Sequence, residues 1–444
     1  MNDSSSCGTL SHFNRRTLLQ AAGMSGICWL TPLAERLARA AEKSPKGAPA
    51  HSVIVLWLQG GPSQHETFDP HPDPTSSVAG GTKRIKTAVK DIYLAEGLPL
   101  VAEQMQHISL VRSLVSKEGD HERATYNVKT GFRPDPTLLH PSIGAVLCHK
   151  TGAADKTTVE IPRHVTILPN QWAARGGYLG DQYDAFQTYD PNGPIPDVTK
   201  QVSEERFGRR LSDLDVVERQ FAKGRLKKLD EAKTLHVDSI KRAQKMMSSD
   251  QLKAFDVSKE PESLRKEFGD DPFGRACLAA IRLIEVGVRC VEVTLDGWDT
   301  HANNHATVAA KNKILDPAFA TLIKELKSRG LLEKTLVLCG GEFGRTPAVT
   351  PATGGREHWP HGFSTALAGG GIRGGTVIGA NDPNPTFEPD QLSKNVKDPR
   401  NVEDIHATVF SALGINFEEE LLTPIGRPMA ISKGKVIREL LATS

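Results

Sequence analysis

The chain contains 444 residues, of which 38% are hydrophobic and 24% are charged. This composition is typical of a globular protein, and the length suffices for one large α/β domain or two smaller ones. There are 55 basic and 53 acidic residues, so the formal net charge is only +2. Such a balance argues against charge-driven binding of nucleic acid or anionic lipid by the chain as a whole.

The N-terminal 40 residues have the pattern of a twin-arginine export leader. Arg15 and Arg16 precede an apolar run over residues 21–33, and an A-x-A cleavage pattern follows at residues 38–40. The apolar run is shorter than an ordinary membrane span. We therefore predict export to the periplasm or the extracellular space, with no stable membrane span after cleavage. An uncleaved membrane anchor is the alternative interpretation.

Strand and helix patterns alternate after a predicted linker at residues 41–50, and we interpret residues 51–444 as a single domain. Continuous apolar runs favour parallel strands buried on both faces. They occur at residues 52–58, 108–111, 164–168, 288–295 and 335–340. Amphipathic helices are predicted at residues 273–285 and 315–328, each followed by a glycine. This order predicts an α/β three-layer sandwich with a mainly parallel central sheet.

A helical insertion is predicted at about residues 203–256, because this stretch is strongly charged and carries apolar residues at helical spacing. It could serve as a lid or partner surface, or simply form a solvated helical hairpin. Outside the leader, the cysteines are Cys148, Cys277, Cys290 and Cys339. None belongs to a C-x-x-C pair, and Cys290 and Cys339 lie in apolar strand runs, so we expect buried packing there rather than disulfides.

Residues with metal-binding chemistry follow the predicted strands. Asp296, Asp299 and His301 come directly after the strand that ends at Leu295. Ligands bind beyond the carboxyl ends of strands in open parallel sheets. Imidazole beside carboxylate suits zinc or manganese better than calcium. An aspartate after a strand is also an ordinary turn or cap residue, which is the alternative for each carboxylate taken alone.

Two more loops contribute candidates. Glu342 could ligate metal and Arg345 could hold an anion bidentately, although the two could equally form a structural pair in a glycine-rich turn. His358 and His361 have a spacing that resembles that of metal ligands. His121 opens a predicted helix, where it could act as a ligand, a base or a nucleophile, unless Asp120 merely caps that helix.

Several of these segments resemble the domain-of-unknown-function 1501 family, which is common in planctomycetes and other bacteria. The matching segments are WLQGGPSQHETFDP (57–70), the segment from His121 to Gly131, GWDTHANN (297–304), GGEFGRTP (340–347), GREHWPHG (355–362) and AGGGIRGGTVIG (368–379). That family is grouped with the alkaline phosphatase and sulfatase superfamily. The resemblance therefore implies an alkaline phosphatase-like fold and a metal-dependent site.

The superfamily pattern is only partly kept. Gln59 stands where the first strand would end in a metal-binding Asp, and His121 stands where a nucleophilic hydroxyl or thiol is expected. The resemblance places metal ligands at Asp296 or Asp299 with His301, at Glu342, and at His358 or His361. The cysteine signature of sulfatases is absent. With fewer ligands than a two-metal site requires, we expect one metal ion at most.

These observations lead to a metal-dependent hydrolase-like protein acting on phosphate or sulfate esters or a related anionic substrate. In this hypothesis the metal is a divalent ion, zinc or manganese, Arg345 neutralises the anion and His121 is the base or nucleophile. The alternative is a non-catalytic binding protein with a degenerate metal site. Convergence of Asp299 and the histidines on one point would favour the hydrolase.

Overall fold

The computed structural model describes residues 50–152, 159–222, 239–382, 384–386, 388 and 390–442. All of these residues fall within one unit of the chain, residues 46–444. The predicted leader, and the linker apart from its last residue, lie outside the described residues. Within the described ranges, no helix combines the length and the apolar character that crossing a bilayer requires.

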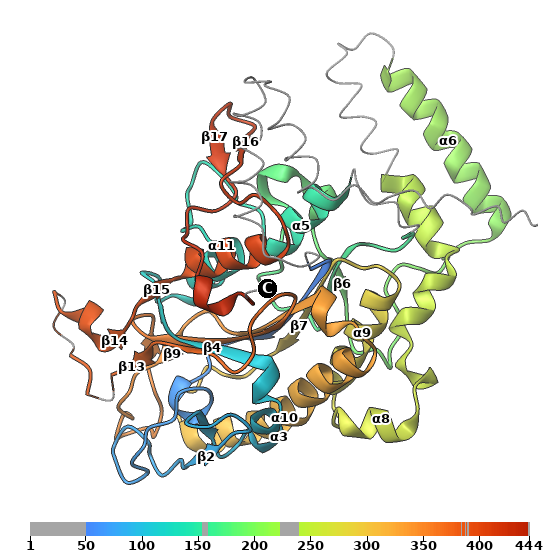
Figure 1. Ribbon diagram of the computed structural model, residues 1–444. Coiled ribbons are helices and arrows are strands. Elements are labelled where there is room, and N and C mark those ends of the chain that lie inside the picture. Colours follow the sequence, from blue (N-terminus) through green and yellow to red (C-terminus); the bar gives the residue numbers. More distant parts are fainter. Residues whose placement is uncertain are drawn as a thin grey trace, which may run out of the picture. The chain divides into compact units, whose positions relative to one another are not determined.

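A nine-stranded sheet forms the centre of the protein (Figure 1), in the order β12-β4-β11-β8-β1-β7-β5-β6 with β15 beside β4. Its strands are β1 (Ser52–Leu58), β4 (Ile108–Val115), β5 (His164–Ile167), β6 (Phe186–Thr188), β7 (Cys290–Leu295), β8 (Thr335–Gly340), β11 (Phe363–Gly369), β12 (Val377–Ile378) and β15 (Arg400–Asn401). Neighbouring strands are parallel except where β11 pairs antiparallel with β4 and β8. The predicted mainly parallel sheet is therefore confirmed.

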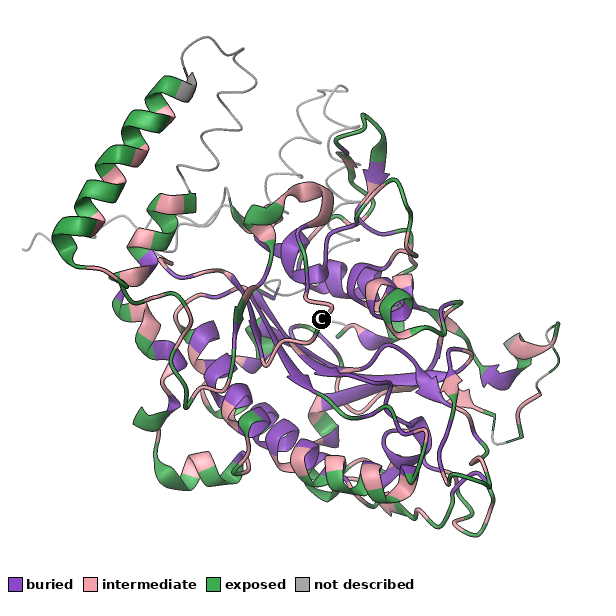
Figure 2. Cartoon of the chain, turned by 180° about the vertical axis from the view of Figure 1, so that it is seen from behind, coloured by how far each residue is buried: buried purple, intermediate pink, exposed green. Residues whose placement is uncertain are grey.

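The alternation of side chains along the strands creates two apolar layers. In β8, Leu336 and Leu338 pack into one hydrophobic cluster, whereas Val337 and Cys339 pack into the other. Successive side chains of a strand point to opposite faces, so both faces of this sheet must be covered. The purple core in Figure 2 shows the result, because the central strands and the helix sides that face them are buried.

Helices cover both faces of the sheet, which confirms the three-layer arrangement. Figure 1 shows α3 (Pro99–Glu103), α9 (Pro272–Glu285) and α10 (Asn304–Ser328) on one side, with α5 (Ile143–Gly152) and α11 (Val402–Ala412) on the other. A further helix, α4 (His121–Thr130), packs against α11. The short α8 (Glu262–Glu267) contacts α9 and α10.

Local sequence signals explain why α9 was predicted closely and α10 was not. The Asp271 carboxylate caps α9 by accepting from the Phe273 and Gly274 N–H groups, and Pro272 occupies the first turn. The predicted second helix began at Leu315, but α10 begins at Asn304. Its polar first turns and its internal Pro317 hide the apolar periodicity on which the prediction relied.

The predicted insertion contains α6 (Glu204–Ala222), then residues 223–238 outside the described ranges, and a 3-10 helix at Asp250–Phe255. No side chain of α6 that the structure describes is buried. The short paired strands elsewhere are β2 (Arg84–Lys86) with β3 (Tyr93–Ala95), β9 (Gly344–Arg345) with β10 (His358–Trp359), β13 (Ala380–Asn381) with β14 (Val396–Lys397) and β16 (Glu420–Leu422) with β17 (Pro428–Ala430).

Four cysteines lie in the described part of the chain, and all four are buried thiols outside disulfides: Cys148, Cys277, Cys290 and Cys339. The expectation that Cys290 and Cys339 pack inside strands is confirmed. Burial raises the pKa of the Cys277 and Cys290 thiols well above the usual value. These thiols are therefore packing groups rather than reactive ones.

Acid is expected to destabilise the fold through His406. This imidazole is buried, its Nε2 lies 2.8 Å from the Val128 carbonyl oxygen, and burial lowers its pKa to about 4. The unfolded chain takes up the proton near the ordinary pKa of 6.5, so stability is unaffected above that pH and falls between about 6.5 and 4. The shift corresponds to about 3 kcal/mol. Urea unfolding at pH 7 and 4.5 checks this, because a His406→Gln variant should show a weaker pH dependence.

Candidate metal centre

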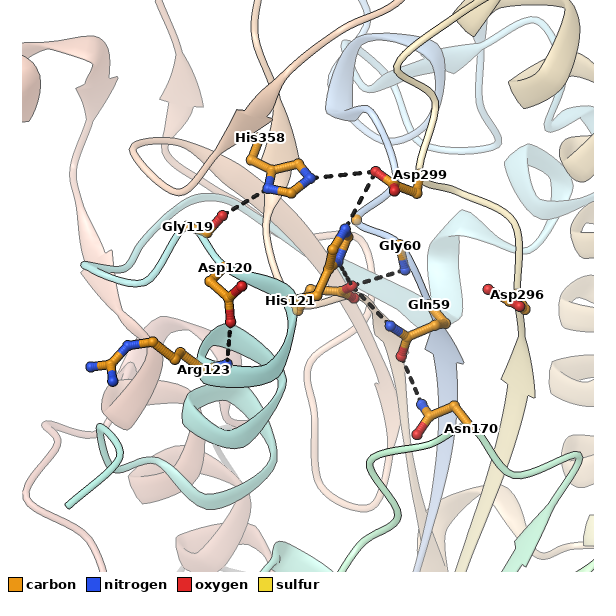
Figure 3. A network of polar contacts seen from close by, with 12 residues as sticks. Gln59, Gly60, Gly119, Asp120, His121, Arg123, Asn170, Asp296, Asp299 and His358 are labelled. Atoms are coloured by element: carbon orange, nitrogen blue, oxygen red, sulfur yellow. Dashed lines mark hydrogen bonds and ion pairs between the residues drawn. The ribbon is translucent and has the colours of Figure 1, made fainter. Parts of the chain in front are cut away.

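The candidate site lies at the edge of the sheet where the parallel strands end. Gln59 and Gly60 follow β1, Asp299 lies shortly after β7, Glu342 follows β8, and His121 opens the helix after β4. Figure 3 shows Gln59, His121 and Asp299 close together beyond the strands. This is the edge at which open α/β sheets bind their ligands, and it is the edge that the sequence predicts.

Two further features bring distant loops to this edge. The two-residue ladder of β9 and β10 places His358 opposite Arg345. Gly60 has φ 112°, and a Cβ there would lie 2.4 Å from the Asp299 backbone nitrogen. The glycine therefore allows β1 and the loop after β7 to approach closely.

Three histidines have their Nδ1 atoms held by groups that only accept hydrogen bonds. The Nδ1 atom of His121 lies 2.8 Å from Glu342 Oε1, and that of His301 lies 2.8 Å from Glu357 Oε2. The Nδ1 atom of His358 lies 2.7 Å from the Gly119 carbonyl oxygen. With a proton on each Nδ1, the Nε2 atoms carry lone pairs, and this is the arrangement that second-shell partners impose on metal-binding histidines.

The Nε2 atoms converge on one oxygen, Asp299 Oδ1. Their distances to it are 3.4 Å for His121, 3.0 Å for His301 and 3.4 Å for His358. The Nε2 atoms of His301 and His358 are 3.1 Å apart. Lone pairs facing one another repel unless a cation or a shared proton lies between them. Ligands around a tetrahedral zinc ion are separated by about 3.3 Å, because zinc–nitrogen bonds measure about 2.0–2.1 Å.

One group of candidate ligands consists of His121, Asp299 and His358, whose ligand atoms lie within 4.8 Å of one another. His301 contacts two of these three residues. Nitrogen ligands with one carboxylate form a donor set that suits zinc, and it also accommodates manganese. The residues present thus fit a divalent ion.

Glu342 contacts the Nδ1 atom of His121, on the side of the ring away from Asp299, and does not join this group. It is completely buried, and its Oε1 accepts from the Gly60 N–H at 2.9 Å, from Gln59 Nε2 at 3.2 Å and from His121. Burial lowers the pKa of His121, but the hydrogen bond and charge of Glu342 outweigh it and leave that pKa above its usual value. Glu342 therefore fixes the His121 ring and increases its basicity.

Arg345 is buried, and its guanidinium is occupied by the protein itself. Its Nε donates to the Gly61 carbonyl at 3.0 Å and its Nη1 to the Arg356 carbonyl at 3.1 Å. Its Nη2 donates to the Gly60 carbonyl and, at 2.5 Å, to Asp299 Oδ1. Burial raises the pKa of Asp299, but the Arg345 hydrogen bond outweighs it and lowers that pKa. Arg345 is thus held by the protein itself, and its ion pair is with Asp299 instead of Glu342, the partner that the structural alternative named.

Besides Glu342, two further predicted ligands lie outside the group. Asp296 is exposed, and its Oδ1 accepts from the Gly297 N–H at 2.6 Å, so it acts as a turn residue; Figure 3 shows it apart from the other side chains. Trp298 is buried, and this anchors the turn that separates Asp296 from Asp299. His361 packs edge-on to Trp359, with ring centroids 5.1 Å apart, while His358 faces Asp299.

Sequence reasoning missed the groups that hold the histidines. Glu357 and the Gly119 carbonyl were not singled out, although each is adjacent to a residue that was. The sequence comparison treated Gln59 only as a replacement for a metal-binding Asp. In the structure its Nε2 donates to Glu342, and its Oε1 accepts from Trp57 Nε1 at 2.7 Å. Only the tertiary structure brings these partners together, so spacing along the chain carries no signal for them.

The fold and the site define an α/β protein with a histidine- and aspartate-based candidate metal centre. The chain belongs to the family described as "Protein of unknown function (DUF1501)", whose profile matches residues 50–441. The family predicted from the sequence motifs is thereby confirmed. A comparison with curated proteins gives no match.

Solved structures with a similar arrangement include three bacterial proteins. The PsFucS1 sulfatase from Pseudoalteromonas sp. is 13% identical, and the match covers 86% of this chain and 72% of that chain with a TM-score of 0.37. The lipoteichoic acid synthase LtaP from Listeria monocytogenes is 11% identical, with coverages of 84% and 74% and a TM-score of 0.40. A protein in the alkaline phosphatase superfamily from Vibrio parahaemolyticus is 12% identical, with coverages of 84% and 69% and a TM-score of 0.35. Similarity of this degree does not transfer an activity to this chain.

Proposed function

We propose that this protein is an exported metal-dependent hydrolase of phosphate or sulfate esters. The observation that supports this proposal is the convergence of His121, Asp299 and His358 within 4.8 Å, from three loops far apart in the sequence. An open position at the mouth of the sheet would suit catalysis better than a closed structural ion site.

In this proposal His121, Asp299 and His358 hold a zinc or manganese ion, with His301 as an additional ligand. A divalent ion at this point would supply a Lewis acid for the ester oxygen and lower the pKa of a bound water. Glu342 keeps the His121 Nδ1 proton in place, and Glu357 does the same for His301. Water and ester would yield an alcohol and the free phosphate or sulfate anion.

The substrate's negative charge would be met by the centre itself. The positive charge of Arg345 is balanced by Asp299, so the excess charge at the site would come from the metal ion. The export part of the proposal rests on Arg15, Arg16 and the cleavage pattern at residues 38–40.

Elemental analysis and an ester screen test this proposal together. The native host is fractionated, the protein is purified from the exported fraction, and bound metals are counted. We expect about one divalent ion per chain and turnover of aryl phosphates or sulfates that a chelator abolishes and added zinc or manganese restores. Bound metal without turnover would support the binding-protein alternative, while absence of both would refute the proposal. Retention in the cytoplasm would refute export alone.

A further inference from the structure

Two side chains hold the loop at residues 169–176 in place, and the first of them binds the candidate site. Asn170 Nδ2 donates to Gln59 Oε1 at 2.7 Å, a contact visible in Figure 3. Gln59 Nε2 in turn donates to Glu342, the residue that orients His121. Because an amide both donates and accepts, Gln59 can link the loop to Glu342, whereas an aspartate at this position could not.

The second attachment is Lys129, whose Nζ donates to the Trp172 carbonyl at 2.9 Å. Lys129 is itself buried, pairs with Glu292 at 2.8 Å and lies 4.8 Å from the centre of the Trp57 ring. A lysine that is desolvated and paired in this way has little freedom to move. The backbone at Trp172 is thus held by a side chain of α4, and that side chain is paired with Glu292 of strand β7.

These attachments place the Trp172 ring beside His121. The ring centroids are 6.3 Å apart and the planes differ by 14°. Phe343 also lies near His121, at 5.0 Å, but it is 1% exposed and cannot reach a ligand. Trp172 is only partly buried, and its neighbour Gln171 is exposed. A partly exposed indole on an anchored backbone, beside a candidate metal ligand, is suited to binding a flat group.

We propose that Trp172 selects the organic part of the substrate by stacking on a ring, so that the esters cleaved are those of carbohydrates or aryl alcohols and not of simple alkyl alcohols. This inference rests on the proposed hydrolase function. Gln59, Asn170 and Lys129 are positioning residues, because they hold Trp172 through the loop. Tryptophan suits this task since its large rigid face loses little conformational freedom on binding.

Steady-state kinetics of Trp172→Ala and Trp172→Phe test the inference, with Gln171→Ala as the control from the same loop. The probes are 4-nitrophenyl, glucose and ethyl esters of phosphate and sulfate. For the two ring-bearing esters, Trp172→Ala should raise KM about tenfold and change kcat less than about twofold. Trp172→Phe should retain most of the affinity, and KM for the ethyl ester should not change. Bound metal should be equal in all variants.

The outcomes separate this inference from the proposed function. A uniform rise of KM for ring and alkyl esters, or no rise, would overturn the role of Trp172 while leaving the hydrolase intact. A rise for the 4-nitrophenyl ester alone would identify aryl esters as the class, and a rise for the glucose ester alone would identify carbohydrates. If the wild-type protein cleaves no ester, calorimetric titration with glucose 6-sulfate and ethyl sulfate tests the stacking directly. Tighter binding of the glucose ester that is lost in Trp172→Ala would support stacking. Equal binding of the two esters by the wild-type protein would refute it.

Discussion

Replacement of His358 with alanine is expected to remove the bound metal, whereas the same replacement at His361 leaves it in place. Both imidazoles are partly buried and lie in one loop, three residues apart. Only His358 directs its Nε2 toward Asp299, at 3.4 Å, with its Nδ1 held by Gly119. Loss of a direct ligand should weaken metal binding by more than about 100-fold, since loss of a supporting group alone costs 10–100-fold.

Metal content after dialysis against a weak chelator measures this difference, and turnover of the best ester from the screen should follow it. Melting temperatures of the two metal-free variants provide the control for folding, and we expect them to agree within a few degrees. If His358→Ala and His361→Ala retain the same amount of metal and the same activity, the geometry around Asp299 does not form the metal centre.

The sheet and its edge could be predicted because they depend on local patterns. The runs at residues 52–58 and 335–340 are apolar on both faces, which only a central strand of a covered sheet requires. The carboxyl ends of parallel strands share one edge, so the sequence alone places the candidate site at this edge. The early start of α10 was missed because its first turns are mostly polar and lack the apolar periodicity of an amphipathic helix.

The choice between neighbouring candidates could not be made from the sequence. Asp296 and Asp299 are separated by a turn whose direction depends on the burial of Trp298 and on Gly297 at φ 92°. The same applies to His358 and His361, which flank the buried Trp359. The two members of each pair are the same residue type in the same loop sequence, so the sequence cannot distinguish them. Long-range packing decides which of the two faces the other loops of the site.

The burial of Arg345 was equally invisible in the sequence, and it leads to the second large expected effect. Arg345→Met should destabilise the protein by about 3–5 kcal/mol, because it leaves three buried backbone carbonyls without their donor, at about 1–3 kcal/mol each. Those carbonyls belong to Gly60, Gly61 and Arg356, in loops that frame the candidate site. Loss of activity would then follow from a disordered site and not from loss of an anion contact.

Urea unfolding in the presence of a chelator measures this effect without the stabilisation that a bound ion adds. Arg219→Met is the matched control, since that side chain and its partner Asp215 are 70% and 64% exposed. An exposed ion pair contributes about 0–1 kcal/mol, so the control should unfold almost as the wild type does. Wild-type stability of Arg345→Met, combined with a raised KM for anionic esters, would instead restore Arg345 as the anion-binding residue. The two outcomes differ because a guanidinium whose hydrogen bonds are all made to the protein stabilises the fold. A guanidinium whose donors bind the substrate contributes to substrate affinity instead.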